Sequence, residues 1–403
     1  MAIIHPFKGW LPVPGKVDEV ACVPYDVINT EEAAQLAEGK PDSFLHVIRP
    51  EIDVDPDTYI YDDAVYDKGA KNLRRLLSSG IYTQDEKNAI YLYQLETGNH
   101  LQTGVFTCAS VQDYDNDVIL KHELTRPDKE DDRTRHILTQ KAHAEPVMLT
   151  FNDTADITFH IEKLTLTQAP DIEHIGDGGV IHRIWKTFDT VDFVEGFSLI
   201  PNFYVADGHH RCKSASRVAE ILRSEKNSRP GEEEFEYFPV VLFPMKQMKI
   251  MPYNRVVKNA PANTIKLLTE KFGAVSTHQN VPPEKGMVCF YTNGEWYLMN
   301  LPGAADESIV NGLDVSRLQD SILEPLFGIT NPRTDEHIGF VGGIRGTAEL
   351  EKLVDSGKYD LAFSMYPTSI QELTEVSDHG ELMPPKSTWF EPKIKSGLII
   401  HTF

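Results

Sequence analysis

The chain has 403 residues, of which 41% are hydrophobic and 25% are charged, a composition typical of a globular protein of two or three domains. It carries 39 Lys and Arg residues against 61 Asp and Glu residues, so its formal net charge is −22. A body this acidic repels nucleic acid and anionic lipid at long range, and we expect neither to be a partner.

No stretch of the sequence approaches the roughly 20 apolar residues that a membrane span needs. The segment Met1–Pro6 lacks the charged start and apolar core of a signal peptide. The four cysteines are scattered and form no Cys-x-x-Cys pair. This pattern favours reduced thiols over a disulfide framework or a zinc site. We therefore expect a cytoplasmic protein.

The N-terminal part of the chain alternates short strands with helices. Helix caps, apolar periodicity and turn residues place these elements. In chain order they are a strand broken by Pro24 (20–28), a short helix from residue 29, a longer helix (57–78), a β-hairpin (89–95 and 101–109), a strand (118–120), a charged helix (125–141) and a buried strand (146–151). Thr125 is expected to cap the charged helix, since the segment that it opens resembles a capping box.

The rest of the chain continues the pattern and contains a second hairpin. Its predicted elements are a strand (203–206), an amphipathic helix (211–222), a strand (237–243), a helix (264–272) and a hairpin (287–291 and 296–301). Asn293-Gly294 joins the last two strands and is a favourable type I′ turn. Hairpins outnumber β-α-β units, which predicts a mixed α+β fold with a largely antiparallel sheet. We expect a domain boundary near residue 262.

The strongest local signal is the segment from Asp207 to Arg211, where an apolar strand enters a glycine turn and then a helix. Gly208 lets the backbone approach a ligand closely, and the N–H groups and dipole of the helix start favour a phosphate. Arg211 could add a bidentate clamp, while His209 and His210 could donate to phosphate oxygens. Asp207 could hold magnesium or orient a histidine. In the alternative interpretation, Asp207 only caps the helix and the histidines lie on the surface.

Residues outside this motif are also candidates. Glu123 lies between the strand at 118–120 and the charged helix, and it could accept a hydroxyl proton near a bound phosphate, or it is a solvated residue of an acidic stretch. The proline-rich segment 384–388 offers a phosphate or carboxylate contact, or else forms a rigid turn. The additional candidate contacts are His122, Thr125, Arg133, Arg255, Lys386, Ser387 and Thr388. The sequence contains no P-loop, nucleophile elbow or His-Glu-x-x-His motif.

Ala-Asp-Gly-His-His-Arg at 206–211 resembles the phosphate-binding motif of the ParB/sulfiredoxin fold. Within that fold it looks most like the free serine kinases, which phosphorylate L-serine to O-phosphoserine with ADP or ATP. His122-Glu123 resembles the upstream pair of those kinases, whose glutamate is taken as the catalytic base. Over nearly its full length the chain resembles the bacterial and archaeal family named domain of unknown function 1015. That resemblance rests on Val23–Ile28, His122–Thr125, Asp207–Arg211, Pro252–Arg255 and Met383–Thr388.

The resemblance implies a ParB/sulfiredoxin-like mixed sheet core with an N-terminal elaboration over residues 1–262, and a further α+β region over 263–403. It implies a kinase that uses ATP or ADP with magnesium and a small-molecule hydroxyl acceptor, with L-serine the leading one. The alternative is a non-catalytic nucleotide-binding regulator. A homodimer is compatible with the C-terminal hairpin. The segment between Glu123 and Asp207 is much longer than in the compact kinases.

The implied roles follow those of the kinases. The nucleotide phosphates would be held by Gly208, His209, His210 and Arg211. Asp207 would contact magnesium or the histidines, and Glu123 would take the hydroxyl proton, so Glu123, Asp207 and His210 are the expected catalytic residues. Such a site suits phosphoryl transfer, where positioning and charge neutralisation do most of the catalysis.

Overall fold

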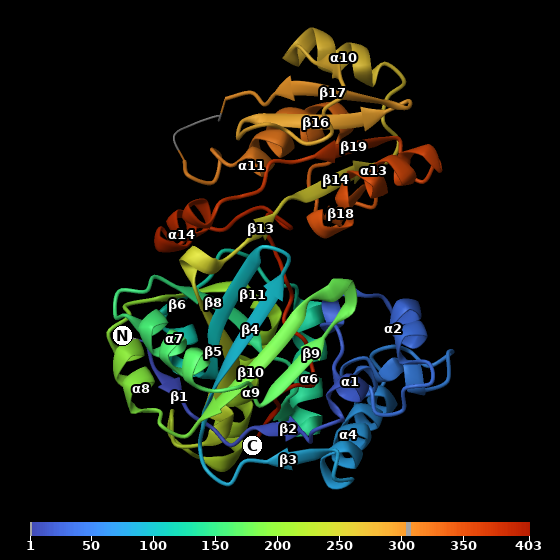
Figure 1. The fold of residues 1–403 in the computed structure, drawn as a ribbon. Coiled ribbons are helices and arrows are strands. Elements are labelled where there is room, and N and C mark those ends of the chain that lie inside the picture. The colour runs from blue at the N-terminus through green and yellow to red at the C-terminus, as the bar shows by residue number, and fades with distance from the viewer. Residues whose placement is uncertain (1, 304–307) are drawn as a thin grey trace. The chain divides into compact units, whose positions relative to one another are not determined.

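The computed structural model describes residues 2–303 and 308–403, which fold into two compact units (Figure 1). The first unit comprises Met1–Lys121, Thr125–Met248 and Pro392–Phe403, and the second comprises His122–Leu124 and Lys249–Glu391. The domain boundary expected between residues 262 and 263 stays a prediction. In the described part of the chain, no helix is both long and apolar enough to cross a membrane.

A nine-stranded mixed sheet forms the centre of the first unit, with the order β6-β11-β8-β12-β5-β4-β10-β9 and β1 paired with β5. The strands are β1 (Ile4–His5), β4 (Ile90–Thr97), β5 (His100–Ser110), β6 (Ile119–Leu120), β8 (Val147–Phe151), β9 (Ile172–Ile175), β10 (Ile181–Thr187), β11 (Phe203–Asp207) and β12 (Tyr237–Pro244). Among them, β6 with β11 and β8 with β12 are parallel, and the other pairs are antiparallel. The predicted α+β class, the largely antiparallel sheet and the first hairpin, β4–β5, are confirmed.

Helices of this unit pack on the sheet and on each other. They are α1 (Val17–Val20), α2 (Thr30–Ala37), α3 (Leu45–Ile48), α4 (Asp63–Ser78), α5 (Val111–Asp115), α6 (Pro127–Gln140), α7 (Ile157–Thr167), α8 (Val191–Ser198) and α9 (His209–Lys226). Helix α6 lies against both α4 and α9. The predicted apolar face of α9 is buried, because its members recur at helical spacing: Ala215, Val218, Ala219 and Leu222.

Three local predictions for this unit are wrong. Residues 20–28 form no continuous strand: Cys22 makes an isolated bridge and Tyr25–Val27 is a short 3-10 helix, since Pro24 cannot donate a backbone hydrogen bond. Helix α4 begins at Asp63, six residues after its expected start. Thr125 does not cap α6. That helix opens on Pro127 after Arg126, without a side-chain cap.

A six-stranded sheet, β15-β17-β16-β19-β14-β18, forms the centre of the second unit. Its elements are α10 (Thr264–Phe272), β14 (Tyr253–Val257), β15 (Val275–Thr277), β16 (Met287–Thr292), β17 (Glu295–Asn300), α11 (Asp314–Leu318), α12 (Glu324–Phe327), β18 (Ile338–Gly342), α13 (Gly346–Asp355), β19 (Leu361–Ser364) and α14 (Ile370–Asp378), with β13 (Ile250–Met251) paired to β20 (Trp389–Phe390). Asn293 and Gly294 both have positive φ and join β16 to β17, as predicted.

The segment Pro392–Phe403 completes the first unit after the second unit has been built along the chain. Strand β21 (His401–Thr402) pairs with β7 (Ala142–His143), and the backbones of Ile400 and Trp10 exchange two hydrogen bonds. The first unit therefore depends on residues from both ends of the described chain.

Burial in the first unit predicts a loss of stability in mild acid. It lowers the pKa of four histidines below the usual value, namely His136, His143, His182 and His401. In the unfolded chain these histidines bind protons near pH 6.5, whereas in the folded protein they stay neutral. The free energy of unfolding therefore decreases as the pH falls below about 6.5. His46, whose pKa is raised by its hydrogen bond to Asp53, opposes the trend.

We expect the free energy of unfolding to fall between pH 7 and pH 5, by up to about 1.4 kcal/mol per pH unit for each such histidine. Urea denaturation at a series of pH values measures this slope. His143→Phe should flatten this slope, because it removes one of the titrating rings. Phenylalanine keeps an aromatic ring at this position, where His143 now contacts the rings of His401 and Phe403. A stability that stays constant over this range would contradict the prediction.

Candidate functional site

The turn between β11 and α9 has the geometry of an anion site. Gly208 is the N-cap of α9 with φ 106°, no side chain caps the helix, and its first turn contains no acidic residue. The positive φ favours glycine, and a Cβ at Gly208 would lie 3.0 Å from Nε of Arg211 and would displace that side chain. A helix start without a cap leaves N–H groups for a phosphate to use.

Asp207 ends β11 and does not cap the helix. Its Oδ2 lies 3.2 Å from Nζ of Lys393 and 3.4 Å from Nη2 of Arg211. Burial alone would raise the pKa of Asp207, but Lys393 and Arg211 outweigh it and hold the pKa well below the usual range. The carboxylate therefore stays ionised at any ordinary pH.

Arg211 lies beneath the turn rather than on the surface. It is 7% exposed, and its Nη1 donates to the carbonyl oxygen of Pro146. Its Nη2 lies 3.8 Å from Oδ2 of Asp26, so this one nitrogen serves two carboxylates, those of Asp26 and Asp207. The short 3-10 helix at Tyr25–Val27 thus contributes an acid to the site, a role that the local sequence did not indicate. The bidentate contact of Arg211 with phosphate stays a prediction.

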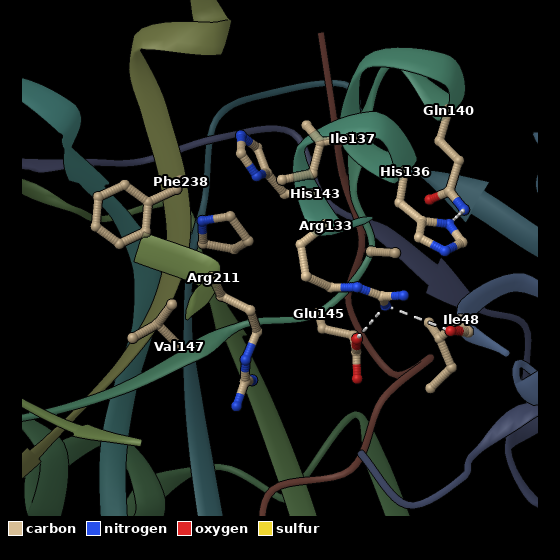
Figure 2. Close-up of a pocket in the computed structure, with 12 residues that line it drawn as sticks. Ile48, Arg133, His136, Ile137, Gln140, His143, Glu145, Val147, Arg211 and Phe238 are labelled. Carbon is tan, nitrogen blue, oxygen red and sulfur yellow. Dashed lines mark hydrogen bonds and ion pairs between the residues drawn. The ribbon is translucent and has the colours of Figure 1, made fainter. Parts of the chain in front are cut away.

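A second layer of buried charge supports Arg211 (Figure 2). The Oε1 atom of Glu145 accepts hydrogen bonds from the Tyr25 N–H (3.1 Å) and the Ser396 hydroxyl (2.9 Å). Arg133 lies 3.9 Å from the other oxygen of Glu145, covers the ring of Tyr25 at 4.2 Å and binds Asp132 through two nitrogens. Arg133 is therefore buried in a network of its own chain, which stabilises the segment around Tyr25.

A small cavity lies within this layer. Its volume is about 30 Å³, enough for a single water molecule, and its polar lining includes Arg133, His143, Glu145 and Arg211. Figure 2 shows these side chains, which come from α6, β7, α9 and the segment before β8, among the residues that line the cavity. Nε of Arg211 and Nε2 of His143 have no partner among the described residues.

The two histidines of the motif differ in their surroundings. His209 is 7% exposed, so the interpretation of both histidines as surface residues is wrong for this one. Nε2 of His210 accepts the backbone N–H of Arg126 at 3.1 Å, which requires an unprotonated nitrogen there. His210 thus joins the first turn of α9 to the start of α6. The hydroxyl of Thr125, the residue before Arg126, donates to Oε1 of Glu130 at 2.5 Å.

Two of the predicted segments meet within the second unit. Nε2 of His122 lies 3.3 Å from the Thr388 hydroxyl, and the carbonyl oxygen of His122 accepts the N–H of Met383. The Ser387 hydroxyl donates to the carbonyl of Pro384, as in a rigid turn, and Nζ of Lys386 lies 5.5 Å from the ring of Tyr253. Glu123 follows His122 in the chain and belongs to the second unit.

Arg255 is a buried cation on β14. It is 3% exposed, its Nη1 donates to the carbonyl of Tyr253, and its guanidinium lies 5.5 Å from the ring of Phe340. Burial lowers the pKa of Arg255 to about 10, so it remains charged at neutral pH. Within residues 2–303 and 308–403, no carboxylate forms an ion pair with it. A ligand contact for Arg255 stays a prediction.

A magnesium ion fits the turn only together with a ligand. No group of three or more His, Cys, Asp or Glu residues in the described part of the chain could hold a metal. Magnesium bound to nucleotides usually takes one or two carboxylates, water and phosphate oxygens. Asp207 and Asp26, which share Arg211, can supply that number of carboxylates.

Comparison with solved structures finds distant likenesses. C-terminally truncated SbnI from Staphylococcus aureus is 14% identical with a TM-score of 0.37, covering 72% of this chain and 85% of its own. A free serine kinase in complex with AMP is 13% identical with a TM-score of 0.36, covering 73% and 92%. A conserved hypothetical protein from Pyrococcus furiosus is 14% identical with a TM-score of 0.34, covering 73% and 95%. Likenesses this remote say nothing about the site.

The sequence comparisons are more decisive. No curated protein matches the chain. Residues 4–316 match a family described as "Protein of unknown function (DUF1015)". The matched range includes both the segment around His122 and the turn at Asp207–Arg211, and it spans most of the chain. The chain therefore belongs to the DUF1015 family.

Proposed function

We propose that this protein is a small-molecule kinase that transfers a phosphoryl group from ADP or ATP to a hydroxyl, with free L-serine as the leading acceptor. The observation that carries the proposal is the start of α9. There the Gly208 turn begins a helix that has no capping side chain and no acidic residue in its first turn. Such a terminus favours a phosphate through its N–H groups and its dipole.

The residues around the turn supply what phosphoryl transfer needs, which is mostly positioning and charge neutralisation. The backbone after Gly208, with His209 and His210, holds the nucleotide phosphates. Arg211 orients Asp207 by pairing with it. Asp207 is the carboxylate for magnesium, which supplies positive charge to the phosphates when bound.

Glu123 is proposed as the base that takes the hydroxyl proton. Strands β6 and β11 are parallel neighbours, so the segments that follow them leave the same edge of the sheet. Arg126, which donates to His210, follows Glu123 by three residues, and such a stretch of chain spans at most roughly 10 Å. The place of Glu123 in the chain, three residues before the donor to His210, thus supports its proposed role as the base.

The test is O-phosphoserine formation from L-serine with magnesium and either ADP or ATP, together with the dissociation constant of each nucleotide. We expect product with one of the donors. Gly208→Ala should weaken nucleotide binding, because its Cβ would press on Arg211. Gly80→Ala is the matched control, since Gly80 has φ 81° and no atom near its would-be Cβ.

Each other result changes the proposal in a defined way. Nucleotide binding that depends on Gly208, without product from serine or other small alcohols, would favour the regulator. If neither nucleotide binds the wild-type protein, the proposal is wrong.

A further inference from the structure

The carboxylate of Asp207 is bound by two cations that differ in their exposure. Nη2 of Arg211 is 3.4 Å and Nζ of Lys393 is 3.2 Å from the same oxygen. Lys393 belongs to the segment that returns to the first unit, and its neighbour Ile394 is 2% exposed. The backbone that carries Lys393 is therefore anchored while its side chain reaches the turn.

Arg211 is the less accessible of the two. Its side chain is 7% exposed, whereas those of Lys393 and Asp207 are 17% and 21% exposed. Its guanidinium also binds the carbonyl of Pro146 and lies beside Asp26. Turning it toward a ligand would break buried contacts, which is costly.

Lys393 has the properties that a phosphate contact needs. Its ammonium group carries three donors on a flexible stem, so it can bind Asp207 and a ligand oxygen together or move between them. A phosphate at the start of α9 would lie near the negative charge of Asp207, which Lys393 offsets together with any magnesium that the carboxylate holds. Lys393 is the more exposed of the two cations that pair with that carboxylate.

From this geometry we infer that Lys393 contacts the phosphate of the bound nucleotide and that Arg211 is a positioning residue beneath it. The inference rests on the proposed function and gives Arg211 a different role from the phosphate clamp that the sequence alone indicated. It assigns the ligand-facing charge to a residue 186 positions from Asp207.

The experiment compares the dissociation constants of ADP for the wild-type protein, Lys393→Met, Lys393→Arg and Lys395→Met. A charged hydrogen bond to phosphate predicts about 10- to 100-fold weaker ADP binding in Lys393→Met. Lys393→Arg should recover part of the affinity because it keeps the charge. Lys395→Met removes the same charge two residues along the same segment and should bind ADP like the wild type.

Melting temperatures show whether each variant is folded, and Lys393→Gln serves if Lys393→Met is not. ADP binding by Lys393→Met equal to that of the wild type would overturn this inference and leave the kinase proposal standing. An equal loss in Lys395→Met would also overturn it, since the effect would then be one of overall charge. Failure of the wild-type protein to bind ADP or ATP would remove both proposals.

Discussion

Glu123→Gln is expected to abolish phosphoryl transfer and to leave nucleotide binding unchanged. The amide has nearly the same shape as the carboxylate but cannot accept the hydroxyl proton. General bases contribute about 10²- to 10⁴-fold to turnover, and we expect a loss within that range. Steady-state formation of O-phosphoserine measures turnover, and the dissociation constant of ADP or ATP measures binding.

The matched control is Glu225→Gln, which changes an exposed glutamate near the end of α9. It should retain full turnover and show that the loss of one negative charge is not the cause. Turnover by Glu123→Gln at the wild-type rate would assign the proton to another group. A parallel loss of nucleotide binding would show that Glu123 holds the ligand rather than acting as a base.

Arg211→Met is expected to cost about 1–3 kcal/mol in the free energy of unfolding of the first unit, because it leaves a buried carbonyl oxygen without its donor and buried Glu145 with one cation fewer nearby. Asp207 would retain Lys393, but Asp26 would lose its ion pair and Glu145 a nearby positive charge. The carbonyl of Pro146 would also lose its donor. Urea denaturation followed by tryptophan fluorescence measures the change.

Arg217→Met is the matched control on the same helix. Arg217 is 31% exposed and pairs with Glu130 and Asp131, and such pairs near the surface contribute about 1 kcal/mol or less. A similar small change for Arg211→Met would mean that the buried network contributes little to folding. A large change restricted to Arg211 would support its assignment as a positioning residue.

The turn at Gly208 could be predicted from the sequence because its signals are local. An apolar strand, a glycine and an amphipathic helix lie within twenty residues, and each follows from propensity and periodicity. The same holds for the two hairpins, which Gly98 and Asn293-Gly294 mark. Local patterns also suffice for the buried face of α9.

The partners of the turn could not be predicted in this way. Three of these partners lie far along the chain from the turn and approach Arg211 or Asp207 only in the folded protein: Asp26, Glu145 and Lys393. No sequence pattern near them indicates such a contact. The sequence motif identified Arg211 as a cation but could not show that carboxylates of the same chain neutralise its charge. The elements between β17 and β20 were also missed, since short strands and helices there have weak periodicity.

The return of residues 392–403 to the first unit sets the order in which a ribosome can complete the protein. The nine-stranded sheet emerges first, yet Lys393, Ser396 and β21 are added only after the whole second unit has been synthesised. During translation the second unit can fold while the first still lacks a strand and the cation at Asp207. A nascent chain stalled within residues 249–391 would therefore carry the glycine turn without a finished site.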